Sequence, residues 1–232
     1  MPKKAISKKM SIAIIFLAII VIATAAIVYA AQISSNKTEE VKVGVHIGDT
    51  FTYKLTGSSV LFSADAVTPD YLSIYNDTDY YTLTITGISG TQVSLNTIWK
   101  LINGTQFASS QSIDIANGNT TDKNGFWALY PSNLNVNDLL SPKGFDQLTV
   151  NATDNKSYAN STRATNFWQI DHEFTDQNDP TGNTRRDEYD GVYFDRQTGM
   201  LVTLTNRQSY SNPIYNIIIT WELTSSNVWA VQ

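Results

Sequence analysis

Alternation of apolar and polar residues is the feature that most constrains how this chain of 232 residues folds. Val93, Leu95 and Trp99 share one parity, whereas Ser94 and Asn96 fall on the other. A period of two puts neighbouring side chains on opposite faces of a strand, so this run predicts a strand with one buried and one solvated face. The same pattern recurs in residues 51–55, 81–85 and 215–223, where β-branched and aromatic residues dominate.

Turn residues between these runs predict antiparallel neighbours. Asn103-Gly104 is a pair that a tight hairpin favours, and residues 87–90 mark another turn. A further hairpin spans residues 192–202, where Asp195 and Gly199 supply the side-chain bond and the positive φ that a short loop needs. Strands joined in this way form a meander.

Two segments lack the alternation. Residues 58–79 are interpreted as an insertion with one helical turn, and residues 131–140 as a short helix over one end of the sheet. Helical periodicity is otherwise nearly absent after the first 31 residues. We therefore expect an all-β domain, an antiparallel meander that forms a strongly curved sheet or half-barrel.

The first residues predict export or anchoring. Lys3, Lys4, Lys8 and Lys9 precede an uncharged apolar run over residues 12–31. Basic residues stay on the cytoplasmic side, so the rest of the chain is delivered to the extracytoplasmic side. The length of the run favours a transmembrane helix that anchors the protein in the cell membrane. Its small residues near Ala31 also suit cleavage of a signal peptide, which would make the domain secreted.

Three parts follow from this reading. Residues 1–31 are the signal peptide or membrane anchor, residues 32–40 are a short polar stalk, and residues 41–232 are a single extracytoplasmic β domain. All 21 acidic residues lie beyond the apolar run. The exported part is therefore strongly acidic, which argues against a nucleic-acid partner.

An exported domain without cysteine has no disulfides, so burial of its core must stabilise it. Export also exposes the chain to glycosylation, for which Asn-x-Ser/Thr is the acceptor pattern. Seven candidates are present, at Asn36, Asn76, Asn103, Asn119, Asn151, Asn155 and Asn160.

No motif of nucleophilic, phosphate or zinc chemistry is present. His46 is interpreted as a surface residue. Asp171 and Glu173 are the carboxylates that a hydrolase would use, provided that a cleft holds a suitable pair about 5 to 9 Å apart.

Aromatic residues are abundant, and those that lie outside the core are candidates for ligand binding. Phe126, Trp127 and Tyr130 would line the mouth of an apolar trough, and Trp168 shares its parity with His172. His172 is either half-buried with one hydrogen-bonded nitrogen or in contact with a ligand.

No cofactor is expected, although an acidic loop offers oxygen ligands that suit calcium. The residues of this weak calcium candidate are Asp176, Asn178, Asp179 and Asp187. The spacing does not match an EF-hand, because Thr181 stands where that loop needs glycine. A solvated acidic loop is the other interpretation.

Residues 41–53, 124–130, 193–201 and 220–229 together resemble a group of uncharacterised archaeal exported proteins. The resemblance covers nearly the whole exported domain and implies an archaeal cell-surface setting without an activity. The Asp-x-x-Thr-Gly-x-Leu hairpin at 195–201 is similar to one in many envelope proteins with curved antiparallel sheets, including lipoprotein carriers. That similarity implies a fold more than a role.

We therefore expect a non-enzymatic cell-surface domain that binds an apolar or glycan ligand or an envelope partner. The alternative is a structural surface component that assembles through sheet edges. The third hypothesis is a carboxylate-based hydrolase.

Overall fold

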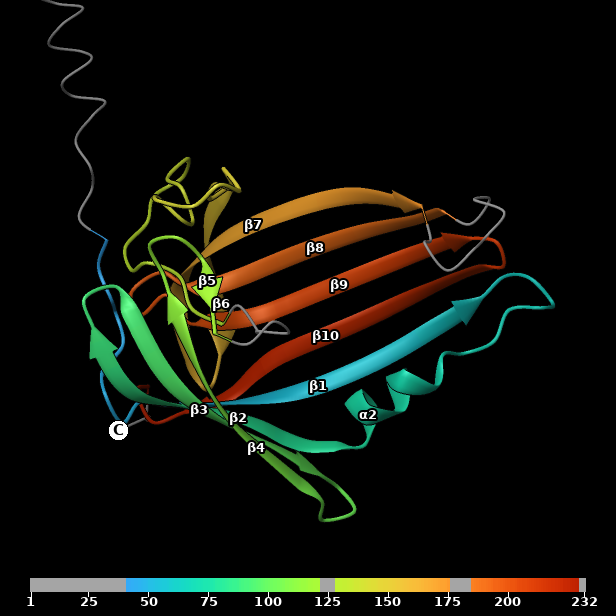
Figure 1. Cartoon of the computed structure of the whole chain (residues 1–232), viewed down its shortest axis with the longest axis horizontal. Coiled ribbons are helices and arrows are strands. Elements are labelled where there is room, and N and C mark those ends of the chain that lie inside the picture. The colour runs from blue at the N-terminus through green and yellow to red at the C-terminus, as the bar shows by residue number, and fades with distance from the viewer. Residues whose placement is uncertain (1–40, 122–127, 176–184, 230–232) are drawn as a thin grey trace, which may run out of the picture. The chain divides into compact units, whose positions relative to one another are not determined.

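The computed structural model describes residues 41–121, 128–175 and 185–229. Within this part of the chain lies one antiparallel sheet in the order β5-β4-β3-β2-β1-β10-β9-β8-β7-β6 (Figure 1). The strands are β1 Thr50–Leu61, β2 Thr78–Ser89, β3 Gln92–Leu101, β4 Gln106–Asp114, β5 Asn119–Thr120, β6 Ala152–Tyr158, β7 Ser161–Thr175, β8 Arg185–Asp195, β9 Leu201–Ser211 and β10 Ile214–Ser226. The predicted all-β class is confirmed.

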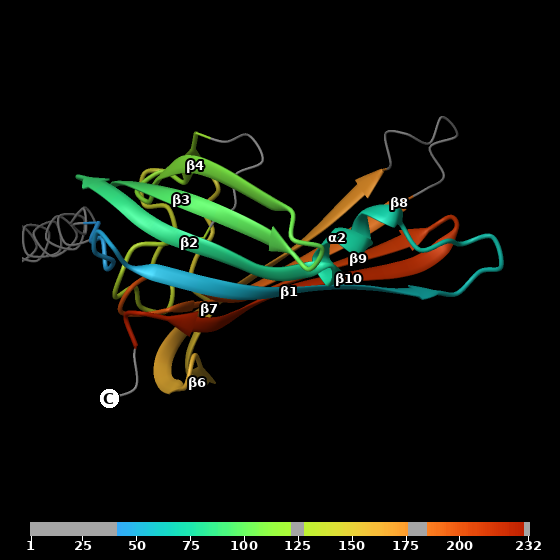
Figure 2. The ribbon, with the colours of Figure 1, turned by 90° about the horizontal axis from the view of Figure 1, so that it is seen from below.

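The sheet consists of two meanders that meet where the first and last strands pair. β1 and β10 run antiparallel, with Leu55 opposite Trp221, so the outer strands are β5 and β6. The sheet curves around one inner face and does not close (Figures 1 and 2).

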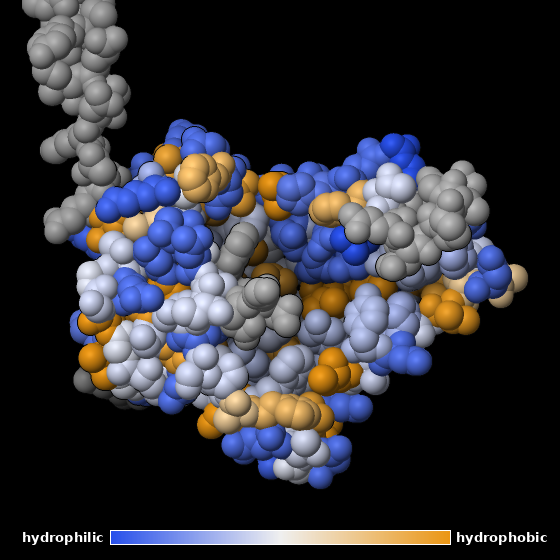
Figure 3. Space-filling view, viewed as in Figure 1, coloured by the Kyte–Doolittle hydropathy of each residue, from blue (hydrophilic) through white to orange (hydrophobic). Residues whose placement is uncertain are grey.

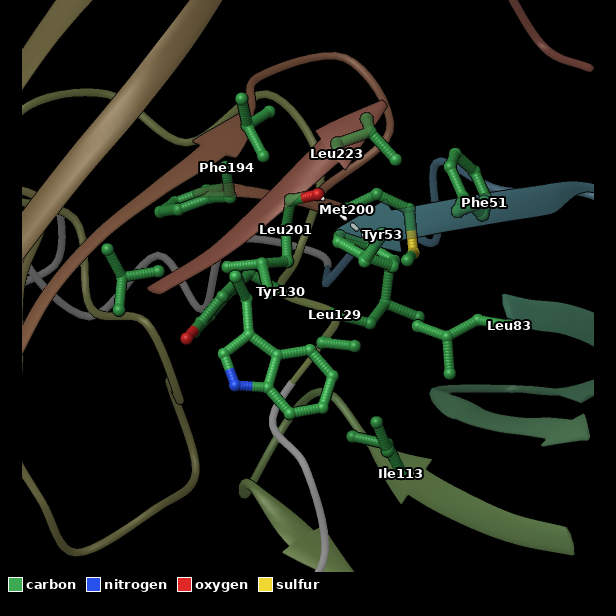
Figure 4. Close-up of a cluster of buried hydrophobic side chains, with 14 of the residues drawn as sticks. Phe51, Tyr53, Leu83, Ile113, Leu129, Tyr130, Phe194, Met200, Leu201 and Leu223 are labelled. Atoms are coloured by element: carbon green, nitrogen blue, oxygen red, sulfur yellow. Dashed lines mark hydrogen bonds between the residues drawn. The ribbon is translucent and has the colours of Figure 1, made fainter. Parts of the chain in front are cut away.

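The inner face carries the residues that the alternation assigns to the core. Phe51, Tyr53 and Leu55 of β1 are buried, while Thr52 and Lys54 between them are not. The hydroxyl of Tyr53 donates to the carbonyl of Leu201 at 2.9 Å, so its polar atom is satisfied within the core (Figure 4). The predicted parity of these strands is confirmed.

The loops differ from the predicted turns in detail. β2 continues through Ser89, and the turn falls at Gly90, which has a φ of 60°. β3 and β4 are joined by residues 102–105, in which Gly104 has a φ of 92°. The predicted helical turn in 58–79 is confirmed as η1 Asp70–Leu72 and α2 Ser73–Asn76, which lies beside β1 (Figure 1).

The predicted helix over residues 131–140 is wrong. This segment is irregular, and it belongs to the long connection from β5 to β6. Its buried residues pack against the inner face, and Figure 4 shows Leu129 and Tyr130 among side chains of β1, β2 and β4. Leu134 and Leu140 are buried by tertiary packing and not by the period of a regular element.

The β8–β9 hairpin holds this connection in place by backbone hydrogen bonds. Tyr130 N–H donates to the carbonyl of Gly199 at 2.9 Å, and Leu201 N–H donates to that of Ala128 at 2.8 Å. Gly199 has a φ of 77°, and a Cβ there would overlap the carbonyl oxygen of Tyr130. The glycine of the Asp-x-x-Thr-Gly pattern is therefore required both by conformation and by space.

Asp195 organises the same hairpin from within. Its carboxylate accepts hydrogen bonds from the Thr198 backbone at 2.7 Å, from Tyr158 OH at 2.5 Å and from Arg163 Nε at 2.6 Å. Arg163 in turn lies over the ring of Trp229. One buried carboxylate thus joins β6, β7, β8 and the C-terminal segment.

Burial by itself raises the pKa of Asp195, but the hydrogen bonds from Arg163, Tyr158 and Thr198 outweigh it. The pKa of this carboxyl therefore lies below its ordinary value. The ionised form is the one that the fold stabilises.

We expect Gly199→Ala to lower the free energy of unfolding by about 3 kcal/mol or more, because a positive φ and an overlap with backbone act together. Gly90→Ala is the matched control, since Gly90 also has a positive φ but has no neighbouring atom within 4 Å. It should cost about 1 to 2 kcal/mol. Urea denaturation measures both, and equal losses would contradict the steric argument.

We expect Asp195→Asn to lower the free energy of unfolding at pH 7 by about 3 to 5 kcal/mol, because it removes the buried counter-charge of the half-buried Arg163 and places an amide among donors that now meet a carboxylate. In the wild type this contribution is complete above the unfolded carboxyl pKa of about 4, and it is lost as the pH falls through the lower folded pKa. Urea denaturation between pH 7 and pH 2 should show the two proteins converging in acid. A constant difference would exclude the carboxylate as its source.

Candidate functional site

The described residues of the β5–β6 connection fill only part of the inner face. Beyond Tyr130 it forms a groove of about 740 Å³, lined from β2, β3, β4 and β7–β10 and by Tyr75 of α2. Figure 3 shows hydrophobic residues gathered in a hollow near the middle of this view. This groove is the candidate functional site.

Strand register explains which residues line the groove. Paired residues on β7, β8, β9 and β10 form successive rows across the inner face. The rows are Trp168-Val192-Leu204-Trp221, then Ile170-Asp190-Asn206-Ile219, then His172-Glu188-Gln208-Ile217. The residues of β8 and β9 on this face therefore change from apolar in the first row to polar in the second and third rows.

Aromatic rings form the apolar part of the groove. The ring centroid of Trp221 lies 4.9 Å from that of Tyr81 and 6.2 Å from that of Trp99, both in edge-to-face geometry. Tyr75 of α2 lies 6.2 Å from Trp99 and extends this cluster. Such contacts hold the rings in fixed orientations.

Hydrogen bonds connect the polar side chains of β8 and β9. The amide nitrogen of Asn206 donates to Glu188 Oε1 at 2.6 Å and to Asp190 Oδ1 at 2.7 Å. Gln208 donates to Asn206 Oδ1 at 2.8 Å. Both hydrogens of the Asn206 amide are thereby used to keep two carboxylates side by side.

The two carboxylates differ in electrostatic environment. Glu188 forms an ion pair with Arg186 at 2.9 Å, whereas Asp190 forms none with any described residue. Burial and the charge of Glu188 raise the pKa of Asp190, while Asn206 and His172 oppose the shift. Asp190 is thus a half-buried carboxylate without a compensating cation.

Two of the predicted ligand-binding residues lie together at this groove. Tyr130 and Trp168 both line it, with ring centroids 6.3 Å apart. Phe126 and Trp127 lie outside the described residues. His172 is exposed near the end of β7 and packs against Phe174, so the interpretation of a half-buried histidine is wrong.

Sequence reasoning did not single out Trp99, Trp221 or Asn206 as site residues, and it did not assign Asp190 to ligand binding. The alternation placed both tryptophans on the inner face but gave no sign that this part of the face is open. A signal was present on β8, where Glu188 and Asp190 share the parity of Val192 and Phe194. Carboxylates on the inner parity of a strand mark a face that is not sealed.

The calcium candidate falls mostly outside the described residues, where Asp176, Asn178 and Asp179 lie. Asp187 is exposed on β8, and no group of three or more metal-ligating side chains occurs in the described ranges. Asp171 and Glu173 have the opposite parity to Trp168, and Glu173 forms an ion pair with Arg185. These carboxylates do not line the aromatic groove.

Six of the seven glycosylation candidates are described, and all six residues are exposed: Asn76, Asn103, Asn119, Asn151, Asn155 and Asn160. Asn36 lies outside the described residues. The amide of Asn76 both donates to and accepts from the backbone of Gly57 on β1, at 2.8 and 3.0 Å. A glycan on this nitrogen would compete with the bond that ties α2 to the sheet.

The sequence matches no protein-family model, and a search of curated proteins finds no match. Among the described residues there is no helix with the length and apolar character needed to cross a membrane.

We expect Asp190→Asn to raise the free energy of unfolding at pH 7 slightly, by less than about 1 kcal/mol. The folded pKa of Asp190 lies above its unfolded value, so its ionised form costs stability at neutral pH and this cost disappears in acid. Urea denaturation at pH 7 and pH 3 measures the difference. Asp187→Asn, on the exposed face of the same strand, is the control and should leave stability unchanged. If Asp190→Asn instead lowered stability, the Asp190 carboxylate would be required for the fold.

Proposed function

We propose that this domain binds a small, partly apolar ligand in the groove on the inner face of its sheet, without catalysing a reaction. The observation that carries the proposal is a groove of about 740 Å³ in which fixed aromatic rings adjoin a hydrogen-bonded polar wall. Small-molecule sites in proteins typically measure about 300 to 1,000 Å³ and combine these two kinds of lining.

The geometry of the rings favours an apolar group over a glycan. Tyr81, Trp168 and Trp221 are only 7%, 4% and 9% exposed, and they contact other rings edge to face. A sugar would need a broad exposed ring face, whereas an apolar chain can pack along ring edges. In this proposal the curved sheet acts as a half-barrel whose unfilled part is the trough.

The setting of this activity follows from the first residues of the sequence. The apolar run over 12–31 would hold the domain on the outer face of a membrane, in keeping with the archaeal cell-surface resemblance. A ligand taken up there would come from the membrane or from the envelope. The same setting fits an envelope partner that delivers or receives the ligand.

A second candidate function is assembly through the outer edge of β4. β5 pairs only with Ile113 and Asp114, and residues 106–111 pair on that side with no strand in the described ranges. These residues include no charge and no proline, whereas β6 at the other edge carries Asp154 and Lys156. Charges and prolines are the usual protection of an exposed edge against strand addition.

We expect the full-length protein, released gently from its own membranes, to carry a discrete non-glycan adduct in native mass spectrometry. Leu204→Trp should reduce the occupancy of that adduct at least about tenfold, because the larger side chain occupies the groove. Thr203→Trp is the matched control, since Thr203 has the opposite parity on β9, and it should retain the adduct.

A ligand-free monomer would contradict the binding proposal. A ligand-free ordered oligomer would also contradict it and would favour assembly through β4. Loss of the adduct in both tryptophan variants would place the ligand outside the groove.

A further inference from the structure

The inner face holds one charge that its own residues do not balance. Of the three charged side chains that follow one another on β8 at this parity, Arg186 pairs with Glu188. Asp190 forms no ion pair with any described residue, although His172 on the adjacent strand lowers its pKa electrostatically. The only hydrogen bond to its carboxylate within that part of the chain comes from Asn206. The formal charge of this wall is therefore −1, in a groove where aromatic rings reduce access of water.

The Asp190 carboxylate shares the groove with Tyr130 and Trp168. Tyr130 lines the same groove as Asp190, and the pKa of its hydroxyl is raised mainly by burial and further by the negative charge of Asp190. Trp168 stands one row from Asp190 on the adjacent strand. A carboxylate flanked by tyrosine and tryptophan rings is the arrangement that attracts an organic cation.

Trp168 supplies an independent sign of a missing ligand. It is 4% exposed and lines the groove, and its indole N–H has no hydrogen-bond acceptor in the described part of the chain. The indole is close enough to the Tyr130 hydroxyl to lower the pKa of that group, but not in the geometry of a hydrogen bond. Buried N–H groups are normally satisfied, so an acceptor atom of a ligand would complete this site.

We propose that the ligand is a cationic amphiphile whose apolar chain lies on the rings around Trp221, whose ammonium group pairs with Asp190, and whose head group also carries a hydroxyl oxygen that accepts from Trp168. This inference rests on the proposed function and specifies the ligand class. An anionic head group would meet Glu188 and Asp190 at close range and be repelled. A neutral polar head group could accept hydrogen bonds but would leave the charge of Asp190 unbalanced.

The test compares three probes that share an eight-carbon chain: octylammonium, octanoate and octyl glucoside. Each is titrated into the full-length protein in lipid nanodiscs, with empty nanodiscs as the blank, and quenching of tryptophan fluorescence reports occupancy of the groove. We expect octylammonium to bind about tenfold more tightly than either other probe. Asp190→Asn should abolish this preference, while Asp187→Asn should retain it.

The outcomes separate the two proposals. Equal affinity for all three probes would overturn the cationic head group and leave the binding groove standing. Equal loss of the preference in Asp190→Asn and Asp187→Asn would assign it to the general acidity of the surface and overturn the role of Asp190. Absence of saturable quenching by any probe would overturn the proposed function itself.

Discussion

The buried carboxylate of Asp195 is the interaction on which the arrangement of this domain depends. It accepts hydrogen bonds from three different segments, and its ionised form offers both oxygens as strong acceptors, Oδ2 to Arg163 and Oδ1 to Thr198. The hairpin that it stabilises presents the carbonyl of Gly199 to the connection between β5 and β6. That contact determines where the connection lies on the inner face, and hence where the groove begins.

A curved sheet of this kind has more inner surface than one connecting segment can cover. Near Tyr130 the connection supplies the apolar side chains that complete a core, and next to it the rings of Trp168 and Trp221 line the groove. The exposed remainder would be an unfavourable apolar surface if all its residues were aliphatic. The polar side chains of β8 and β9 lie in the two rows that follow the apolar row of Val192 and Leu204.

Alternation in the sequence was sufficient to predict the strands, their inner faces and the β8–β9 hairpin, because period two follows directly from backbone geometry. It could not locate the groove, since Leu95 in the sealed core and Trp99 at the groove share one parity. The irregular path of residues 131–140 was also beyond reach, because it depends on hydrogen bonds with distant residues. Arg196, for example, accepts from the Asn133 N–H through its carbonyl and donates from its guanidinium to the Leu134 carbonyl. Pairing of Glu188 with Asn206 likewise depends on the register of two strands.

The polar wall is difficult to explain as a means of stabilising the fold. Two adjacent carboxylates repel each other, and the Asn206 amide commits both of its hydrogens to hold them on the same face. Apolar residues at the same positions would extend the core beside Ile219 without this cost. The retention of a carboxylate without an ion pair at Asp190 is therefore better explained by the proposed binding of a ligand than by the stability of the fold.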